Sequence, residues 1–249
     1  MTMAGARDLA PTTREPVSEF EAMGITAFTT TRSAGDFALP GAVEVIDENA
    51  SRWRALAGSL SGARGALVHA VQVHGVTIAE HERTWTGWRS LDGFDAHLVV
   101  APGAAAVTVA DCVPIFVAHD GGAVAIVHAG WRGTAARLLP LAIAAMGRRG
   151  LDPAGLAVHF GPAICGRCYE VGPDVFAKLT GWQTARHRHV DLRGLLTEQA
   201  RMSGVRRVSA SASCTRCDNA RFFSHRAGDS ARQVGVIVSR AQGCVAALP

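Results

Sequence analysis

The sequence predicts a globular chain of mixed α/β (α+β) class, and three observations support this. Hydrophobic residues make up 48% and charged residues 18% of the chain, proportions typical of a protein with a buried core. Short apolar runs rich in β-branched residues recur along the chain, with segments of helical spacing between them. The length of 249 residues is long for one domain and short for two, so we expect one domain or one duplicated unit.

The first part of the chain begins with a tail and continues mainly with strands. Residues 1–18 carry early charges and no apolar run of the kind that a secretory signal needs, which predicts a flexible tail. The β-branched and aromatic run at 25–31 predicts a strand, and apolar residues at helical spacing predict a helix at 48–60. Apolar, β-rich runs predict two further strands at 66–73 and 76–81.

The residues in the middle of the chain predict three strands, of which the last two form a hairpin. Small and β-branched residues alternate at 105–110, as in a buried strand. Pro114 cannot donate to a central ladder, so we expect a bulge or turn near it before a strand resumes at 115–118. The residues Asp120-Gly121-Gly122 predict a hairpin turn, because Asp-Gly favours positive φ, and the returning strand follows at 123–128.

The last part of the chain mixes helices and strands. Helical spacing covers 138–146, with Thr134 as a candidate N-cap and Pro140 as a position that kinks the helix or moves its start. Apolar runs and an early Pro predict the remaining elements, which are strands at 156–160, 205–210 and 234–238 and helices at 173–179 and 192–202.

Charge and composition exclude several classes of protein. The net charge of +4 comes from scattered residues that are almost all Arg, and Tyr169 is the only Tyr, so no nucleic-acid surface is expected. The most apolar stretch, 98–118, contains Pro102, Asp111 and Pro114, which argues against a membrane span. Six Cys in a chain of this length do not suggest a disulfide scaffold, and we expect a reducing, cytoplasmic location.

Three segments each end an apolar run on a potential metal ligand. These ligands are His74, Cys112 and His128, a borderline-soft set that suits zinc, with copper less favoured. Three protein ligands leave the fourth tetrahedral position open, as in catalytic zinc sites. The hairpin would bring Cys112 and His128 together, and we expect His74 to come from a third strand lying alongside. Taken singly, each of these residues is more often an ordinary core or loop residue.

Other candidate sites have equally simple structural explanations. Arg132 stands between a strand and a helix, where backbone N–H groups and a guanidinium can bind an anion, or where it is only a surface Arg. Asp111 could accept a proton, hold a substrate hydroxyl or a ligand imidazole, or only cap a turn. Two CxxC pairs, Cys165/Cys168 and Cys214/Cys217, could share one zinc, but their separation favours free buried or pocket-lining thiols.

A series of motifs resembles the YfiH-like family, also labelled multicopper polyphenol oxidase or laccase-domain proteins. The resemblance covers roughly Ile25 to the C-terminus. The matching segments are Gln72-Val73-His74-Gly75, Asp95-Ala96, Ala110-Asp111-Cys112 with Pro114, His128-Ala129-Gly130-Trp131-Arg132-Gly133, Gly161-Pro162-Ala163-Ile164, Cys168-Tyr169-Glu170-Val171, Cys214-Thr215 and Phe222-Phe223-Ser224.

The resemblance implies a single domain at 19–249, built as a layered αββα sandwich with two mixed sheets, like cytotoxic necrotizing factor-like folds and a family of cysteine hydrolases. It implies one zinc ion held by His74, Cys112 and His128. It also implies phosphorolysis of adenosine, inosine and methylthioadenosine, and deamination of adenosine. Some bacterial members are linked instead to peptidoglycan quality control, and older labels give copper-dependent phenol oxidation.

The chain departs from the family in segments that we expect to line the pocket. The family's Arg-x-Gly-Gly is replaced by Arg32-Ser33-Ala34-Gly35, and the segment between Phe37 and Asp47 is shortened and rewritten. The usual Tyr after Phe-Phe-Ser is His225. Because the three metal ligands are intact, we expect these changes to leave metal binding unaffected. We expect them to alter which substrate binds, since the changed segments are expected to line the pocket.

The leading hypothesis is therefore a zinc enzyme acting on a nucleoside and phosphate, as a monomer or small homo-oligomer. Its catalytic residues would be Asp111, Cys112 and His128, and its substrate-binding residues Arg32, Gln72, Arg132 and Tyr169. One alternative is a metal-free cysteine hydrolase in which His128 activates Cys112. Another is a cell-wall-linked or peptidoglycan-editing factor. A copper polyphenol oxidase is least favoured, because His187-Arg188-His189 is the only His-x-His pair.

Overall fold

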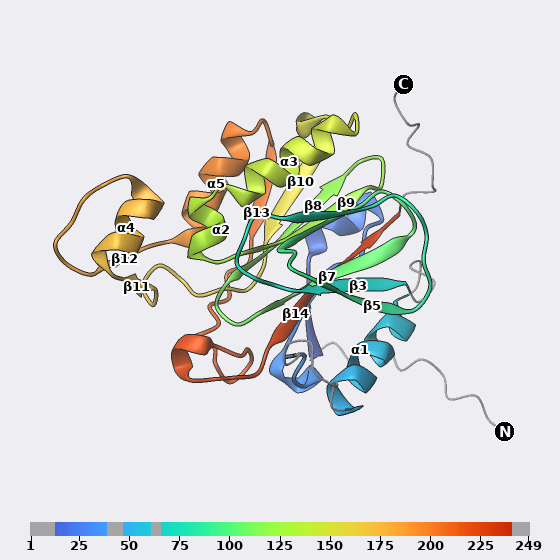
Figure 1. The fold of residues 1–249 in the computed structure, drawn as a ribbon, viewed down its shortest axis with the longest axis horizontal. Coiled ribbons are helices and arrows are strands. Elements are labelled where there is room, and N and C mark those ends of the chain that lie inside the picture. Colours follow the sequence, from blue (N-terminus) through green and yellow to red (C-terminus); the bar gives the residue numbers. More distant parts are fainter. Residues whose placement is uncertain (1–12, 39–46, 61–65, 241–249) are drawn as a thin grey trace.

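The computed structural model describes residues 13–38, 47–60 and 66–240. Two six-stranded mixed sheets dominate it (Figure 1). The first sheet has the order β1 (Arg14–Pro16), β2 (Ala27–Thr30), β14 (Gln233–Ser239), β7 (Gly103–Val109), β3 (Leu67–Val71) and β5 (Trp88–Asp92). The second has the order β13 (Arg207–Ala210), β10 (Leu156–Phe160), β8 (Val113–His119), β9 (Val124–Ala129), β6 (Ala96–Val99) and β4 (Ile78–His81).

Helices cover the outer face of each sheet, which confirms the predicted layered α/β arrangement with two mixed sheets. Helix α1 (Asp47–Ser59) lies on the first sheet, whereas α3 (Leu138–Arg148) and α5 (Leu192–Met202) pack against the second (Figure 1). The short α2 (Trp131–Ala135) follows β9. Helix α4 (Pro173–Thr180) lies near a small pair of strands, β11 (Glu170–Val171) and β12 (Arg188–His189), at the left of Figure 1.

Strand alternation explains why the sheets stack. In β7, Ala105, Val107 and Val109 face the second sheet, whereas Ala104 and Ala106 face α1. Every second side chain of a strand points to the same face, so a strand buried on both faces is apolar throughout. Strand β8 repeats the pattern: its odd-numbered residues pack toward α3 and its even-numbered residues toward the first sheet.

The helices bury the stripes that their spacing predicts. Trp53, Leu56 and Ala57 of α1 are buried against the first sheet, at the i, i+3, i+4 spacing of one helical face. Leu192 and Leu196 of α5 are buried in the same core as α3. None of the helices in the described part of the chain is long and apolar enough to cross a bilayer.

Most predicted elements are confirmed, but the length of the tail, the N-cap at Thr134 and the place of the turn near Pro114 are wrong. The predicted tail of 1–18 is too long: Arg14–Pro16 pairs with β2 as an edge strand, where Pro16 is tolerated. Thr134 is not the N-cap of the following helix. The hydroxyl of Thr134 donates to the Gly130 carbonyl within α2, and Arg137, with φ of 60°, separates α2 from α3. Pro140 consequently lies in the first turn of α3, where its missing N–H costs little.

The predicted bulge at Pro114 is displaced along the chain. Pro114 lies inside β8, opposite His128, and its carbonyl accepts from the N–H of Gly161 at 2.9 Å. The turn falls earlier, at Asp111, whose φ is 87°. Strands β5 and β6 were not predicted.

Candidate metal centre

Three side chains from separate segments meet at one end of the two sheets. One ligand atom each from His74, Cys112 and His128 lies within 4.8 Å of the others. His128 continues the alternation of Val124 and Ile126 in β9, so its side chain points toward the first sheet. Cys112 lies where the chain crosses from β7 in the first sheet to β8 in the second.

His74 does not come from a strand beside the hairpin, as we expected. Its side chain nevertheless lies close to Cys112 and His128, as we expected. His74 follows β3, which pairs with β5 and β7 in the first sheet, not with the hairpin strands β8 and β9. The three ligands therefore converge across the space between the sheets. The backbone at His74 has φ of 59°, a left-handed conformation that turns the chain toward the second sheet.

Asp95 holds two of the three candidate ligands in place. Its carboxylate is fully buried and accepts from the backbone N–H groups of Val73 at 3.2 Å, His74 at 3.0 Å and Gly75 at 2.7 Å. The same carboxylate lies 2.8 Å from His128 Nδ1. A carboxylate on Nδ1 leaves Nε2 of the imidazole free to face a metal.

Sequence reasoning assigned no function to Asp95, although Asp95-Ala96 is one of the motifs that resemble the family. Burial raises the pKa of Asp95, but the bonds from His128 and from backbone N–H groups outweigh burial and keep that pKa below its ordinary value.

The electrostatics favour a thiolate beside an imidazolium when no metal is bound. Burial alone raises the pKa of Cys112, but the neighbouring His128 and His74 lower it to about 6. Burial lowers the pKa of His128, whereas Cys112 and Asp95 raise it to about 9. A thiolate is the form in which Cys binds metals.

Gly130 allows the thiol of Cys112 to approach the helix that follows β9. A Cβ atom at this position would lie 2.8 Å from Cys112 Sγ and 3.5 Å from His74 Cδ2. Real Cβ atoms do not approach a sulfur so closely, so a side chain here would push the thiol out of place.

A cavity of about 670 Å³ opens beside the three ligands. Its lining includes Gln72, Asp36, His225 and Arg232. Ala38, from the rewritten segment, also lines the cavity, so two of the segments that depart from the family pattern, at Ala38 and at His225, line the pocket as predicted. Residues 39–46 of the rewritten segment lie outside the described residues.

His69 also lines the cavity, and sequence reasoning missed it. Its ring stacks on Trp53 with centroids 4.2 Å apart and on Trp88 at 5.6 Å. Burial lowers the pKa of His69 to about 4, so the ring is neutral. The sequence signal that could have identified His69 is the alternation of side chains along β3.

The carboxylate of Asp111 is buried and hydrogen-bonded, so it does not project freely into the cavity. Its carboxylate accepts from the hydroxyl of Thr215 at 2.6 Å and from the backbone N–H of Arg226 at 2.7 Å. The carbonyl of Asp111 accepts from the N–H of Ile164 at 3.1 Å. These bonds hold the turn that presents Cys112.

The other predicted substrate residues have structural partners. The amide of Gln72 lines the cavity but is paired on both sides with Thr108. Arg32 donates to Asp229 at 2.8 Å and to the carbonyls of Asn219 and Phe222.

Arg132 and Tyr169 lie against other side chains. The exposed Arg132 places its guanidinium over the Trp131 ring, 4.3 Å from its centroid. Tyr169 is buried in the same core as α3 and α5, and burial raises its pKa to about 12. Arg226 stacks over the Tyr169 ring at 4.8 Å.

Comparisons with known proteins agree with this architecture. Residues 37–240 match the family described as multi-copper polyphenol oxidoreductase laccase. The YfiH protein of Bacillus licheniformis has the same fold, with a TM-score of 0.80 and 23% identity over 95% of this chain and 100% of that chain. YlmD from Geobacillus stearothermophilus gives a TM-score of 0.76 and 26% identity over 87% of this chain and 92% of that one.

Curated relatives carry enzyme names. A purine nucleoside phosphorylase of Streptomyces coelicolor is 36% identical over 75% of this chain and 78% of its own length. A purine nucleoside phosphorylase of Deinococcus radiodurans is 32% identical over 84% of this chain and 87% of its own length. An adenosine deaminase from an unknown prokaryote is 34% identical over 55% of this chain and 58% of its own length. The family match, the shared fold and these relatives together show that the chain belongs to the multi-copper polyphenol oxidoreductase laccase family, the group of YfiH-like proteins that its motifs resemble.

Proposed function

We propose that this chain is a zinc-dependent enzyme that acts on purine nucleosides, by phosphorolysis of adenosine, inosine and methylthioadenosine and by deamination of adenosine. The observation that carries the proposal is the convergence of His74, Cys112 and His128 within 4.8 Å beside an open cavity. Relatives named purine nucleoside phosphorylase and adenosine deaminase supply the substrate class.

The residues fit a zinc ion. Two imidazoles and a thiolate are ligands that zinc prefers, and three of them suit a catalytic ion with an open position. Asp95 orients His128 through Nδ1, as carboxylates commonly do for metal-bound His. When bound, zinc supplies Lewis-acid chemistry at that open position.

The chain's own residues would bind and orient the substrate around this centre. The cavity volume of about 670 Å³ suits a nucleoside, since small-molecule pockets run from roughly 300 to 1,000 Å³. Arg232 brings a cation to the lining, where it can attract phosphate. His225 offers ring nitrogens for a sugar hydroxyl or a base. Asp111 serves as a positioning residue, since its carboxylate already accepts two internal bonds.

A nucleoside panel tests the proposal. Zinc-loaded protein should release free base from adenosine, inosine and methylthioadenosine only when phosphate is present, and ammonia from adenosine without phosphate. Chelated protein and the His74→Ala variant should lose both activities, whereas His187→Ala, a substitution at an exposed histidine, should retain them. If folded, zinc-loaded protein turns over none of these nucleosides, the proposal fails.

A second candidate function is favoured by a different observation. Cys112, His128 and Asp95 form a thiol–imidazole–carboxylate series, the arrangement that activates a cysteine nucleophile. A metal-free cysteine hydrolase would act on amides after chelation and lose activity when Cys112 is alkylated. Stoichiometric metal, together with loss of activity on chelation, would eliminate this candidate.

Copper-dependent phenol oxidation receives no comparable support. Laccase chemistry needs several coppers with many His ligands. In the ranges that the structure describes, the His-containing group of possible metal ligands is His74, Cys112 and His128 alone. His189, in the one His-x-His pair, lies in the exposed strand β12.

A further inference from the structure

The two CxxC motifs, far apart in sequence, are brought together by the second sheet. Cys165 and Cys168 follow β10, and Cys214 and Cys217 follow β13. Strands β10 and β13 are parallel neighbours, so both loops leave the sheet at the same edge. The pairing continues beyond the strands, through a bridge between Ala163 and Cys214.

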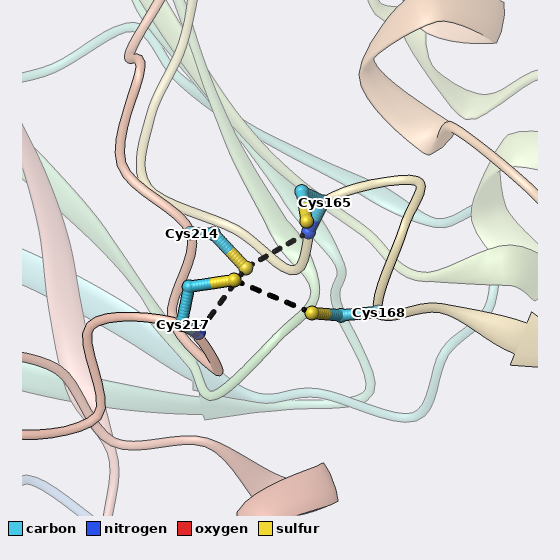
Figure 2. Close-up of side chains that lie close together, drawn as sticks. All are labelled: Cys165, Cys168, Cys214 and Cys217. Atoms are coloured by element: carbon cyan, nitrogen blue, oxygen red, sulfur yellow. Dashed lines mark hydrogen bonds between the residues drawn. The ribbon is translucent and has the colours of Figure 1, made fainter.

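The four sulfur atoms form one compact group (Figure 2). All of them lie within 4.8 Å of one another, and the sulfurs of Cys168 and Cys217 are 3.4 Å apart. Four sulfurs that each lie about 2.3 Å from one zinc ion at tetrahedral angles are about 3.8 Å apart. The observed group therefore needs only small side-chain adjustments to surround an ion.

Backbone and side-chain contacts match a site for thiolates. The N–H groups of Cys165 and Cys217 point at Cys214 Sγ, at 3.2 and 3.4 Å (Figure 2). Such N–H···S bonds stabilise negative charge on sulfur. Each CxxC turn also carries an arginine, Arg167 and Arg216, and Arg216 donates to the Cys168 carbonyl at 3.2 Å. Two arginines thus belong to the turns that hold the four thiols, and their positive charge would partly offset that of a tetrathiolate site.

We propose that Cys165, Cys168, Cys214 and Cys217 bind one structural zinc ion, separate from the centre at His74, Cys112 and His128. Binding displaces the thiol protons to solvent and leaves the oxidation state of sulfur unchanged. Four protein ligands close the coordination sphere, which is the mark of a structural and not a catalytic zinc site. The ion therefore joins the loop after β10 to the loop after β13.

This join bears on the first centre through hydrogen bonds to Asp111, from Ile164 in the loop after β10 and from Thr215 in the loop after β13. Thr215, inside the second CxxC turn, donates to the buried carboxylate of Asp111, the residue before Cys112. The N–H of Thr215 bonds to the carbonyl of Ala163 at 3.3 Å, so it is held between the two loops. Thr215 is thus a positioning residue for the turn that presents Cys112.

Zinc content by mass spectrometry tests the site in the full chain. Protein purified from zinc-containing medium should hold about two zinc ions per chain, and the Cys168→Ser/Cys217→Ser variant about one. Cys244→Ser, which removes a cysteine outside both CxxC motifs, should leave the content unchanged. Equal zinc in wild type and the double variant overturns the proposal, and iron in place of zinc overturns zinc as the metal.

A second variant keeps the test independent of the proposed activity and of the folding of the cysteine variant. His74→Ala/His128→Ala removes two ligands of the first centre and should still bind about one zinc ion per chain. In this variant, cobalt substitution should produce the intense sulfur-to-metal absorption of a tetrathiolate. Peptide mapping should find all four CxxC thiols protected from alkylation until a chelator is added. Alkylation without chelator, or disulfides among the four in freshly purified protein, overturns the proposal.

Discussion

Asp95→Asn is the sharpest test of how the first centre is built. The carboxylate accepts four hydrogen bonds, from three backbone N–H groups of the turn at 73–75 and from His128 Nδ1. Val73 and Gly75 bond one oxygen, and His74 and His128 bond the other. Asparagine keeps a single acceptor oxygen, so at least two of these donors lose their partner and face an NH₂ group instead.

The cost follows from the number of donors left unpaired. A hydrogen bond to a buried charged group contributes about 1.5–3 kcal/mol, so two lost bonds lower the free energy of unfolding by about 3–6 kcal/mol. Because the affected groups carry or orient two metal ligands, zinc affinity should fall by about 10- to 100-fold.

Two measurements check this expectation. Urea denaturation of the metal-free protein gives the free energy of unfolding, and competition with a chromophoric chelator gives the zinc affinity. Asp92→Asn, a substitution at an exposed aspartate of β5, is the matched control and should change neither quantity. If Asp95→Asn unfolds at the wild-type urea concentration and keeps wild-type zinc affinity, Asp95 does not hold the two ligands in place as described.

Two further substitutions follow from single contacts. Gly130→Ala places a Cβ 2.8 Å from Cys112 Sγ and should weaken zinc binding by about 10-fold, as measured by chelator competition. Gly147→Ala, where nothing lies within 4 Å, is its control, and equal affinities would contradict the expectation. Asp229→Asn should lower stability by about 1 kcal/mol near neutral pH, allowing for solvent screening. The hydrogen bond from Arg32 lowers the pKa of Asp229 to about 2, so its contribution is complete above the unfolded-state pKa and disappears as pH falls toward 2. Urea midpoints of the two proteins should therefore converge between pH 5 and 2, and a constant difference would refute this reasoning.

The fold could be predicted largely because most elements carry strong periodic signals. Helix α5 has the expected bounds, and its buried Leu192 and Leu196 lie one turn apart. Strand β5 escaped prediction because its residues Trp88–Asp92 are mostly polar and exposed at a sheet edge. Strand β6 escaped because four residues within a longer apolar stretch have no distinct period.

The site could be predicted only as a set of ligands. His74, Cys112 and His128 are recognisable because each ends an apolar run with a residue type that packing does not require. Their supports are not recognisable, since Asp95 resembles any turn aspartate until the structure shows the four donors around it. The CxxC pairs were interpreted as separate thiols because sequence does not reveal that β10 and β13 are neighbours.

Asp111 shows why the supports matter as much as the ligands. Its φ of 87° is unfavourable for a residue with a side chain, by about 1–2 kcal/mol. Bonds from Thr215 and Arg226 to its carboxylate outweigh that cost, because both acceptors are buried and charged. The chain can therefore turn sharply between β7 and β8 and place Cys112 between the sheets. Since Thr215 belongs to a CxxC turn, the position of the thiol at the first centre depends on the loop that the four cysteines would hold.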